Sequence, residues 1–205
     1  DMEKLMRAEG IPLFSLESRH PLKDFDIIGF SLGYELSYTN VLNMLDLAGI
    51  PVLASERPAL SGAEGDSSYP LIIAGGTCAV NPEPLADFID FFAIGEGEEV
   101  LLELMDSYRQ HKGQEKQQIL RQMATIPGVY VPSLYQVEYE ADGVIKSIKP
   151  TVPEAPATIQ RRIVEMLPPP VTKPVVPYIE VIHDRGAVEI QRGCSHGCRF
   201  CQAGI

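Results

Sequence analysis

Three cysteines near the end of the sequence have a spacing that suits metal binding. Cys194, Cys198 and Cys201 occur as C-x3-C-x2-C within EIQRGCSHGCRFCQAGI, and Cys78 is the fourth cysteine of the chain. Thiolate sulfur is a soft, anionic donor that binds iron or zinc. A loop this short cannot surround one metal ion, but it can present three sulfurs to one face of a cubic [4Fe–4S] cluster. Because such a cluster usually has four cysteine ligands, three would leave one iron with an open coordination position, which marks a reactive site.

This loop resembles the signature of the radical S-adenosylmethionine (SAM) superfamily, C-x3-C-x-aromatic-C. Phe200 is the aromatic residue, and a predicted strand at 187–193 precedes the loop, as the first strand of the partial (β/α) barrel does in that family. The resemblance implies that Cys194, Cys198 and Cys201 hold a [4Fe–4S] cluster and that Phe200 contacts the cofactor. It also implies that S-adenosylmethionine binds the open iron and is cleaved to a 5′-deoxyadenosyl radical, with an electron from a donor such as flavodoxin or ferredoxin.

A zinc site is the alternative interpretation of the same three cysteines. The fourth ligand would then be His196 or a residue outside this sequence, although a histidine inside the x3 loop would be strained to reach the same metal. The protein would in that case be a non-enzymatic α/β binding module with structural zinc. Cys78 directly follows an apolar run and is predicted to be a buried, inert thiol. An RNA methylthiotransferase would need three N-terminal cysteines, where Cys78 alone is available.

The charge and composition of the chain argue against several partners. The net charge is −11, and eight acids occur between residues 83 and 106 without a lysine or arginine. Such a surface repels a phosphate backbone, which argues against nucleic-acid binding through it. No apolar run reaches the roughly 20 residues that span a bilayer, and no leader is recognisable. The clustered cysteines favour a reducing, cytoplasmic environment. The sequence begins inside an amphipathic helical pattern, so we expect a further segment upstream.

Short apolar runs alternate with helical patterns between residues 26 and 112. This order is typical of βαβ units, so the sequence predicts an α/β fold with a Rossmann-like parallel sheet and flanking helices on both faces. The predicted strands are 26–32, 50–55, 69–76 and a strand from 91 to the glycine at 95, and the predicted helices are 34–49, 81–90, 98–113 and 114–125.

Polar residues and glycines follow three of these strands, where parallel sheets bind their ligands. The crevice beyond the carboxyl ends of the strands is the usual ligand site in such sheets. We therefore expect cofactor contacts at the three strand ends, from Ser31, Gly75, Gly76, Gly95, Glu96 and Gly97. The alternative explanation is that tight turns between strand and helix need glycine whatever the sheet binds.

The α/β part also resembles the cobalamin-binding-type domain that precedes many radical SAM barrels. The stretches DMEKLMR, PLFSLES, YELSYTNVLNMLDLAGIPV and NPEPLADF resemble one uncharacterised branch of that group, whose members are described as cobalamin-binding-type radical SAM proteins or Fe–S oxidoreductases. Cobalamin is therefore a possible second cofactor. The sequence departs from the Asp-x-His-x-x-Gly motif that often binds the cobalt in such domains, because VIHDRG has Val181 where the motif needs aspartate.

The remaining sequence predicts a hairpin, a proline-rich connector and the start of a barrel. Asp142-Gly143 favours a type I′ turn, with Tyr135, Val137 and Tyr139 on one face of the hairpin. Residues 150–177 contain eight of the 17 prolines, with a short helical pattern at 158–167. We predict an α/β domain at 1–127, a hairpin and connector at 128–186, and the first strand of a truncated (β/α) barrel with its cysteine loop at 187–205. We expect these residues alone not to cleave S-adenosylmethionine.

Overall fold

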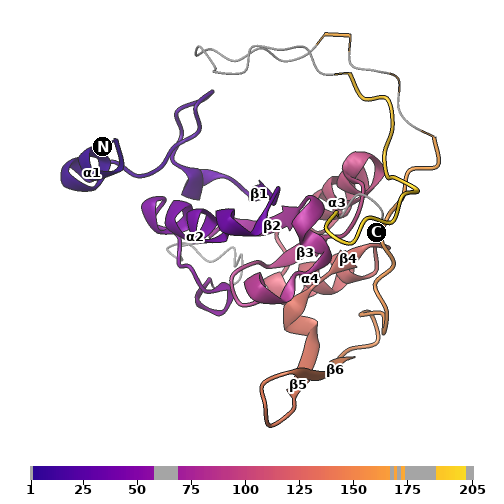
Figure 1. Ribbon diagram of the computed structural model, residues 1–205. Helices are drawn as coiled ribbons and strands as arrows, with labels where there is room; N and C mark the ends of the chain where they lie inside the picture. Colours follow the sequence, from indigo (N-terminus) through magenta and orange to yellow (C-terminus); the bar gives the residue numbers. More distant parts are fainter. Residues whose placement is uncertain (1, 58–68, 167–168, 170–171, 174–187, 202–205) are drawn as a thin grey trace. The chain divides into compact units, whose positions relative to one another are not determined.

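The computed structural model describes residues 2–57, 69–166, 169, 172–173 and 188–201 (Figure 1). The chain divides into two units, Asp1–Val164 and Glu165–Ile205. Within the described residues, all helices and strands lie in the first unit, and the second contains turns and bends.

A four-stranded sheet in the order β1-β2-β3-β4 forms the centre of the first unit. β1 (Ile27–Ser31), β2 (Leu71–Gly75) and β3 (Phe91–Ala93) are parallel, and β4 (Val129–Tyr130) pairs antiparallel with β3. The predicted α/β class is confirmed, with a sheet that is mostly parallel. The antiparallel edge strand was not predicted.

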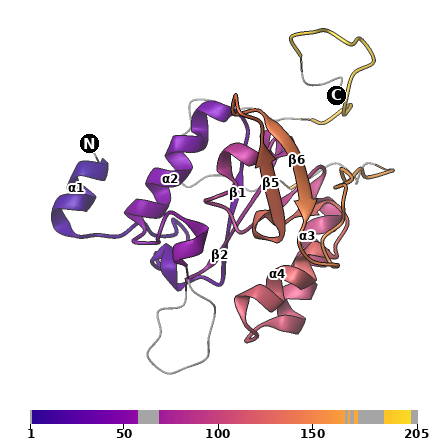
Figure 2. The same cartoon turned by 90° about the horizontal axis from the view of Figure 1, so that it is seen from below.

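Helices cover both faces of this sheet. α2 (Tyr38–Leu47) lies on one side, and α3 (Gly97–His111) and α4 (Lys116–Ala124) lie on the other (Figure 2). The chain begins with α1 (Met2–Glu9), where the helical pattern was predicted. In the described part of the chain, no helix combines the length and apolar composition that crossing a bilayer requires.

The side chains of β2 alternate between two hydrophobic cores, as the period of a strand dictates. Leu71 and Ile73 pack in the core shared with α3 and α4. Ile72 and Ala74 pack in the core shared with α2. The two phenylalanines of β3 divide in the same way, so the uninterrupted apolar run at 71–74 reflects a strand buried on both faces.

A buried ion-pair cluster joins the sheet to α4 and to the segment that ends at Arg57. The Asp90 carboxylate accepts a hydrogen bond from the Ile72 amide at 2.7 Å, and it lies 2.6 Å from Lys116 Nζ and 3.4 Å from Arg57 Nη2. Arg57, Asp90 and Lys116 are 2%, 3% and 7% exposed. Charges at this depth lose several kcal/mol of hydration each, so they are tolerated only when paired.

Backbone carbonyls accept the other hydrogen bonds of the two buried cations. They belong to Pro51, Val52 and Phe88 for Arg57, at 2.7 to 2.9 Å, and to Ala54 and Arg57 for Lys116, at 3.1 to 3.4 Å. Burial lowers the pKa of Arg57, and the Asp90 carboxylate opposes that shift. The cluster therefore holds the segment 51–57 against the start of α4.

The prediction of a strand at 50–55 is wrong for this reason. The segment contains bends and a short 3-10 helix, Ala54–Glu56. Because the Pro51 and Val52 carbonyls accept hydrogen bonds from Arg57, they face that side chain instead of a neighbouring strand.

The helix predicted at 81–90 is also wrong. The structure has the 3-10 helices Thr77–Val80 and Glu83–Leu85 there, and Asn81 caps neither with its side chain. Pro82 and Pro84 favour short turns here, because neither has an amide hydrogen to donate to an α-helical backbone hydrogen bond.

The hairpin is confirmed as β5 (Tyr135–Tyr139) and β6 (Ile145–Pro150). Its turn is not type I′, which needs a positive φ at both central residues. Gly143 has φ +85°, but Asp142 does not have a positive φ. The Glu140 amide donates to the Val144 carbonyl at 2.8 Å and so closes a longer loop.

Two further elements predicted from the sequence are absent from the described residues. No helix occurs at 158–166, where Arg162 instead forms an isolated parallel bridge with Gly95. No strand occurs at 188–193. A strand is stable only when a neighbouring strand accepts and donates its backbone hydrogen bonds, and no strand of the described residues lies in register with this segment.

Replacing Asp90 with Asn should cost more stability than any exposed ion pair of this unit. The substitution leaves two buried cations facing a neutral amide, and breaking a buried pair typically costs roughly 3–5 kcal/mol. Urea denaturation of the 205-residue chain followed by circular dichroism measures the free energy of unfolding. The control is Asp106→Asn, which breaks an exposed pair with Arg109 and should cost about 0–1 kcal/mol. Equal losses in the two variants would contradict a central role for Asp90.

Candidate functional site

The three predicted metal ligands lie on an exposed loop of the second unit. Cys194, Cys198 and Cys201 are free thiols and all three are exposed. The Cys201 amide donates to the Cys198 carbonyl at 3.1 Å, which closes a tight turn between these two cysteines. Gly197, directly before Cys198, has φ +61°, a backbone conformation that glycine adopts without strain.

The donor set fits a thiolate-ligated cluster by its chemistry. In the residues that the structure describes, no three His, Cys, Asp or Glu side chains are gathered closely enough to hold a metal ion. Three accessible thiols on tight turns nevertheless supply what a cluster needs, because metal–sulfur bonds themselves draw such ligands together when the metal binds. Phe200 is 93% exposed, so its ring is available to a cofactor beside Cys201. The assignment of these four residues stays a prediction.

The carboxyl ends of β1 and β2 meet, as the parallel sheet requires. Ser31 is the register partner of Gly75, and the Leu32 amide donates to the Gly75 carbonyl at 2.7 Å. The Cys78 amide donates back to the Leu32 carbonyl at 3.1 Å. A Cβ at Gly76, which has φ +97°, would lie 2.8 Å from the Leu32 carbonyl oxygen. Gly76 is therefore required by the close approach of two segments of this chain, and Cys78 is buried as predicted.

The end of β3 contacts the connector. Gly95 has φ +109°, and a Cβ there would lie 2.3 Å from the Arg162 carbonyl oxygen. The Glu96 amide donates to the same oxygen at 3.1 Å. Gly97 begins α3 with open space around its Cβ position. The role of these residues in binding a cofactor stays a prediction, and the structure gives Gly95 and Glu96 a role in chain packing.

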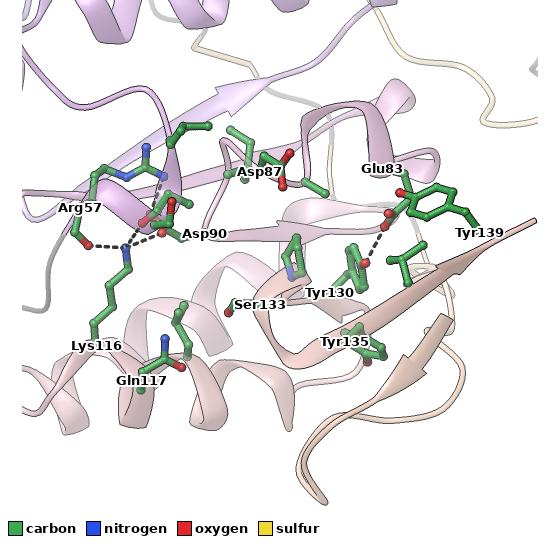
Figure 3. Close-up of a pocket in the computed structure, with 18 residues that line it drawn as sticks. Arg57, Glu83, Asp87, Asp90, Lys116, Gln117, Tyr130, Ser133, Tyr135 and Tyr139 are labelled. Atoms are coloured by element: carbon green, nitrogen blue, oxygen red, sulfur yellow. Dashed lines mark hydrogen bonds and ion pairs between the residues drawn. The ribbon is translucent and has the colours of Figure 1, made fainter. Parts of the chain in front are cut away.

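A pocket of about 740 Å³ lies in the first unit, away from the strand ends that the sequence singled out (Figure 3). The buried cluster of Arg57, Asp90 and Lys116 lies at one end, and the hairpin residue Tyr139 lies at the other. None of the site residues predicted from the sequence lines this pocket. One signal could have indicated part of it, because a charged residue such as Asp90 directly before a fully apolar strand must find a buried partner.

A second polar pair, between Glu83 and Tyr130, lines the same pocket. The Tyr130 hydroxyl donates to Glu83 Oε1 at 2.5 Å. Burial, reinforced by the Glu83 carboxylate, raises the pKa of Tyr130 far above its usual value. The Tyr130 ring lies 4.9 Å from the ring of Tyr135, centroid to centroid. The strongest polar groups of this pocket thus pair with one another, which suits structure or ligand binding better than acid–base catalysis.

A comparison with known protein families shows which family the chain belongs to. A family model described as radical SAM proteins, N-terminal, matches residues 1–132, which is more than half of the 205 residues. The chain belongs to this family. The cysteine loop at 194–201 lies outside the matched region, so the α/β part indicates the superfamily independently of the cysteines. The prediction of a radical SAM protein is confirmed at that level.

The known relatives add little about the activity of this radical SAM N-terminal domain. An uncharacterised protein of Methanocaldococcus jannaschii is 25% identical over 206 residues, which cover 96% of this chain and 34% of the relative. The chain therefore spans about a third of the length of that relative. No solved structure gives a significant match.

Replacing Tyr130 with Phe removes the hydroxyl that donates a hydrogen bond to the Glu83 carboxylate, which then lacks this partner. At pH 7 the free energy of unfolding should fall by about 1.5–3 kcal/mol, as for other hydrogen bonds to charged groups. Urea denaturation measures the loss. Tyr139→Phe is the control, because its ring is exposed and a surface change typically costs less than about 0.5 kcal/mol.

The native protein and Tyr130→Phe should also differ in how their stability responds to alkaline pH. Because the pKa of Tyr130 is raised in the folded state, its contribution to stability is fully present below pH ~10, where unfolded tyrosines begin to ionise. It is lost as the pH rises above that value. The stability difference between the native protein and Tyr130→Phe should therefore narrow between neutral and strongly alkaline pH. A constant difference would show that Tyr130 has an ordinary pKa.

Proposed function

We propose that this chain is the N-terminal part of a radical SAM iron–sulfur enzyme in which Cys194, Cys198 and Cys201 hold a [4Fe–4S] cluster. The observation that carries the proposal is the agreement between two separate parts of the chain. Residues 1–132 match the radical SAM N-terminal family, and the cysteine loop has the spacing and the aromatic residue of the superfamily signature.

The chemistry of the proposed enzyme divides between the cluster and the residues of this chain. When bound, the cluster supplies one electron and an open iron for reductive cleavage of S-adenosylmethionine, and a flavodoxin or ferredoxin is the proposed electron donor. The three cysteines provide thiolates on an exposed loop, where both cluster and electron donor have access. Phe200 provides an apolar face next to Cys201 for the adenosyl part of the cofactor.

Cobalamin is left out of this proposal. The chain lacks the Asp-x-His-x-x-Gly motif, since VIHDRG has Val181 in place of the aspartate. The backbone at the ends of β2 and β3 also packs against other parts of the chain, at Gly76 and Gly95.

In this proposal, binding of the substrate and completion of the reaction require the whole protein. This chain spans 34% of the length of its relative, and the substrate of a radical enzyme is bound by the barrel that encloses the radical. We propose that the 205 residues bind the cluster without completing the cleavage of S-adenosylmethionine.

Anaerobic reconstitution with iron and sulfide tests the ligand assignment. The native chain should become brown and take up about four irons per chain. Cys198→Ser should retain less than about half of that iron, because losing one of three thiolates leaves two to hold the cluster. Cys78→Ala is the matched control, since Cys78 is buried and should not bind iron.

Two results would contradict the proposal. A colourless protein with one zinc per chain would identify the cysteine loop as a structural zinc site in a non-enzymatic module. Equal iron uptake by Cys198→Ser and the native chain would place the iron elsewhere. Circular dichroism of each variant shows whether the α/β unit remains folded, so that loss of iron is not confused with unfolding.

A further inference from the structure

The connector returns to the carboxyl end of β3 after the hairpin and binds there through its backbone. The Arg162 amide donates to the Ile94 carbonyl at 2.9 Å, and the Glu96 amide donates to the Arg162 carbonyl at 3.1 Å. Gly95 and Arg162 form a parallel bridge as a result. Extended peptides bind to sheets by backbone hydrogen bonds of this kind, here made by the residues that follow β3.

Two glycines leave the space that Arg162 occupies. A Cβ at Gly95 would lie 2.3 Å from the Arg162 carbonyl oxygen and 2.6 Å from its amide nitrogen. A Cβ at Gly128, which has φ +85°, would lie 2.5 Å from Arg162 Cγ. Such distances are shorter than any van der Waals contact, so a side chain at either position would displace the connector.

Acidic side chains of α3 and of the residue before it receive the arginine and the backbone that follows. Arg162 binds Glu103 with both Nη atoms, at 2.7 and 3.2 Å, and Nη2 also donates to Glu99 at 3.0 Å. The Glu96 carboxylate accepts from the Val164 amide. The carboxylates of Glu103 and Glu99 raise the pKa of Arg162, with Glu103 the larger cause, and the side chain of Arg162 is 18% exposed.

We propose that Gly95, Gly128, Glu96, Glu99 and Glu103 form a peptide-binding site for an extended segment with a central arginine. The connector fills this site in cis through Arg162. A planar guanidinium paired with two carboxylates is a specific contact, since lysine cannot make the bidentate pair with Glu103. Part of the acidic run at 83–106, whose charge argues against nucleic-acid binding, therefore binds the protein's own chain. The proposal does not depend on the iron–sulfur cluster.

The site has a consequence for what this edge of the sheet can bind. Small ligands of parallel α/β sheets bind beyond the carboxyl ends of the strands. At β3 the connector occupies that position, so a small ligand could enter there only after Arg162 leaves.

Hydrogen exchange of the full 205-residue chain tests the site. In Arg162→Ala, the amides of Glu96 and Val164 should exchange about tenfold faster or more. The variant lacks the hydrogen bonds from Arg162 to Glu99 and Glu103, so local opening of the connector costs less free energy. The amides of β2 should be unchanged and report that the sheet is intact. Arg109→Ala is the control, since Arg109 pairs with the exposed Asp106 on α3, the helix that also carries Glu99 and Glu103.

A second pair of variants tests the shape of the site without altering a charge. Gly95→Ala should give the same faster exchange, because its methyl group meets the Arg162 backbone. Gly113→Ala is the matched control, since Gly113 has a similar φ of +92° but nothing within 4 Å of its Cβ position. Unchanged protection of Glu96 in both Arg162→Ala and Gly95→Ala would overturn the proposal.

A peptide added in trans tests whether the site recognises arginine. The peptide ATIQRRIVEM, which reproduces residues 157–166, should restore protection of the Glu96 amide in Arg162→Ala. The same peptide with alanine at the second of its two arginines should not. Equal restoration by both peptides would show that the backbone alone is recognised and that the arginine site is wrong.

Discussion

The carboxylate of Asp90 is the interaction on which the α/β unit depends. It binds the Ile72 amide at the start of β2, while its own amide donates to the Ile72 carbonyl at 2.8 Å, so the register of β2 and β3 is fixed at this point. Its ion pairs with Arg57 and Lys116 bring the segment 51–57 and α4 to the same place. Since a buried ion pair is no more stable than a well-packed apolar cluster, its contribution here is to select one arrangement of these four segments.

The opposite end of the sheet is organised by close packing of backbone. Gly76 and Gly95 have positive φ angles and lie against Leu32 and Arg162, so no larger residue fits at either position. Glycine-rich strand ends in a parallel sheet usually suggest a phosphate or cofactor site. In this unit the same glycines are explained by contacts within the chain, which separates the fold of the domain from any assumption about its ligand.

The sequence predicted features that depend on local patterns and missed those that depend on distant contacts. The strands predicted at 26–32 and 69–76 and the helix predicted at 98–113 are confirmed as β1, β2 and α3, because apolar period and helix propensity are properties of the segment itself. The segments 50–55 and 158–167 also have suitable local patterns, but Arg57 binds carbonyls of the first and Arg162 anchors the second to β3. The pocket was missed because its wall combines residues more than 80 positions apart, from Leu53 to Tyr139. The assignment of the cysteine loop to a cluster rests on the local spacing of the cysteines and on Phe200, and it stays a prediction.

The central claim is that three cysteines hold a cluster with one iron open to S-adenosylmethionine. Electron paramagnetic resonance of the reconstituted, reduced protein tests it most directly, because the spectrum of a reduced cluster responds to its ligands. The account predicts a clear change in the spectrum when S-adenosylmethionine is added and no change when an unrelated nucleoside is added. A cluster that forms on these cysteines but gives the same spectrum with and without S-adenosylmethionine would contradict it.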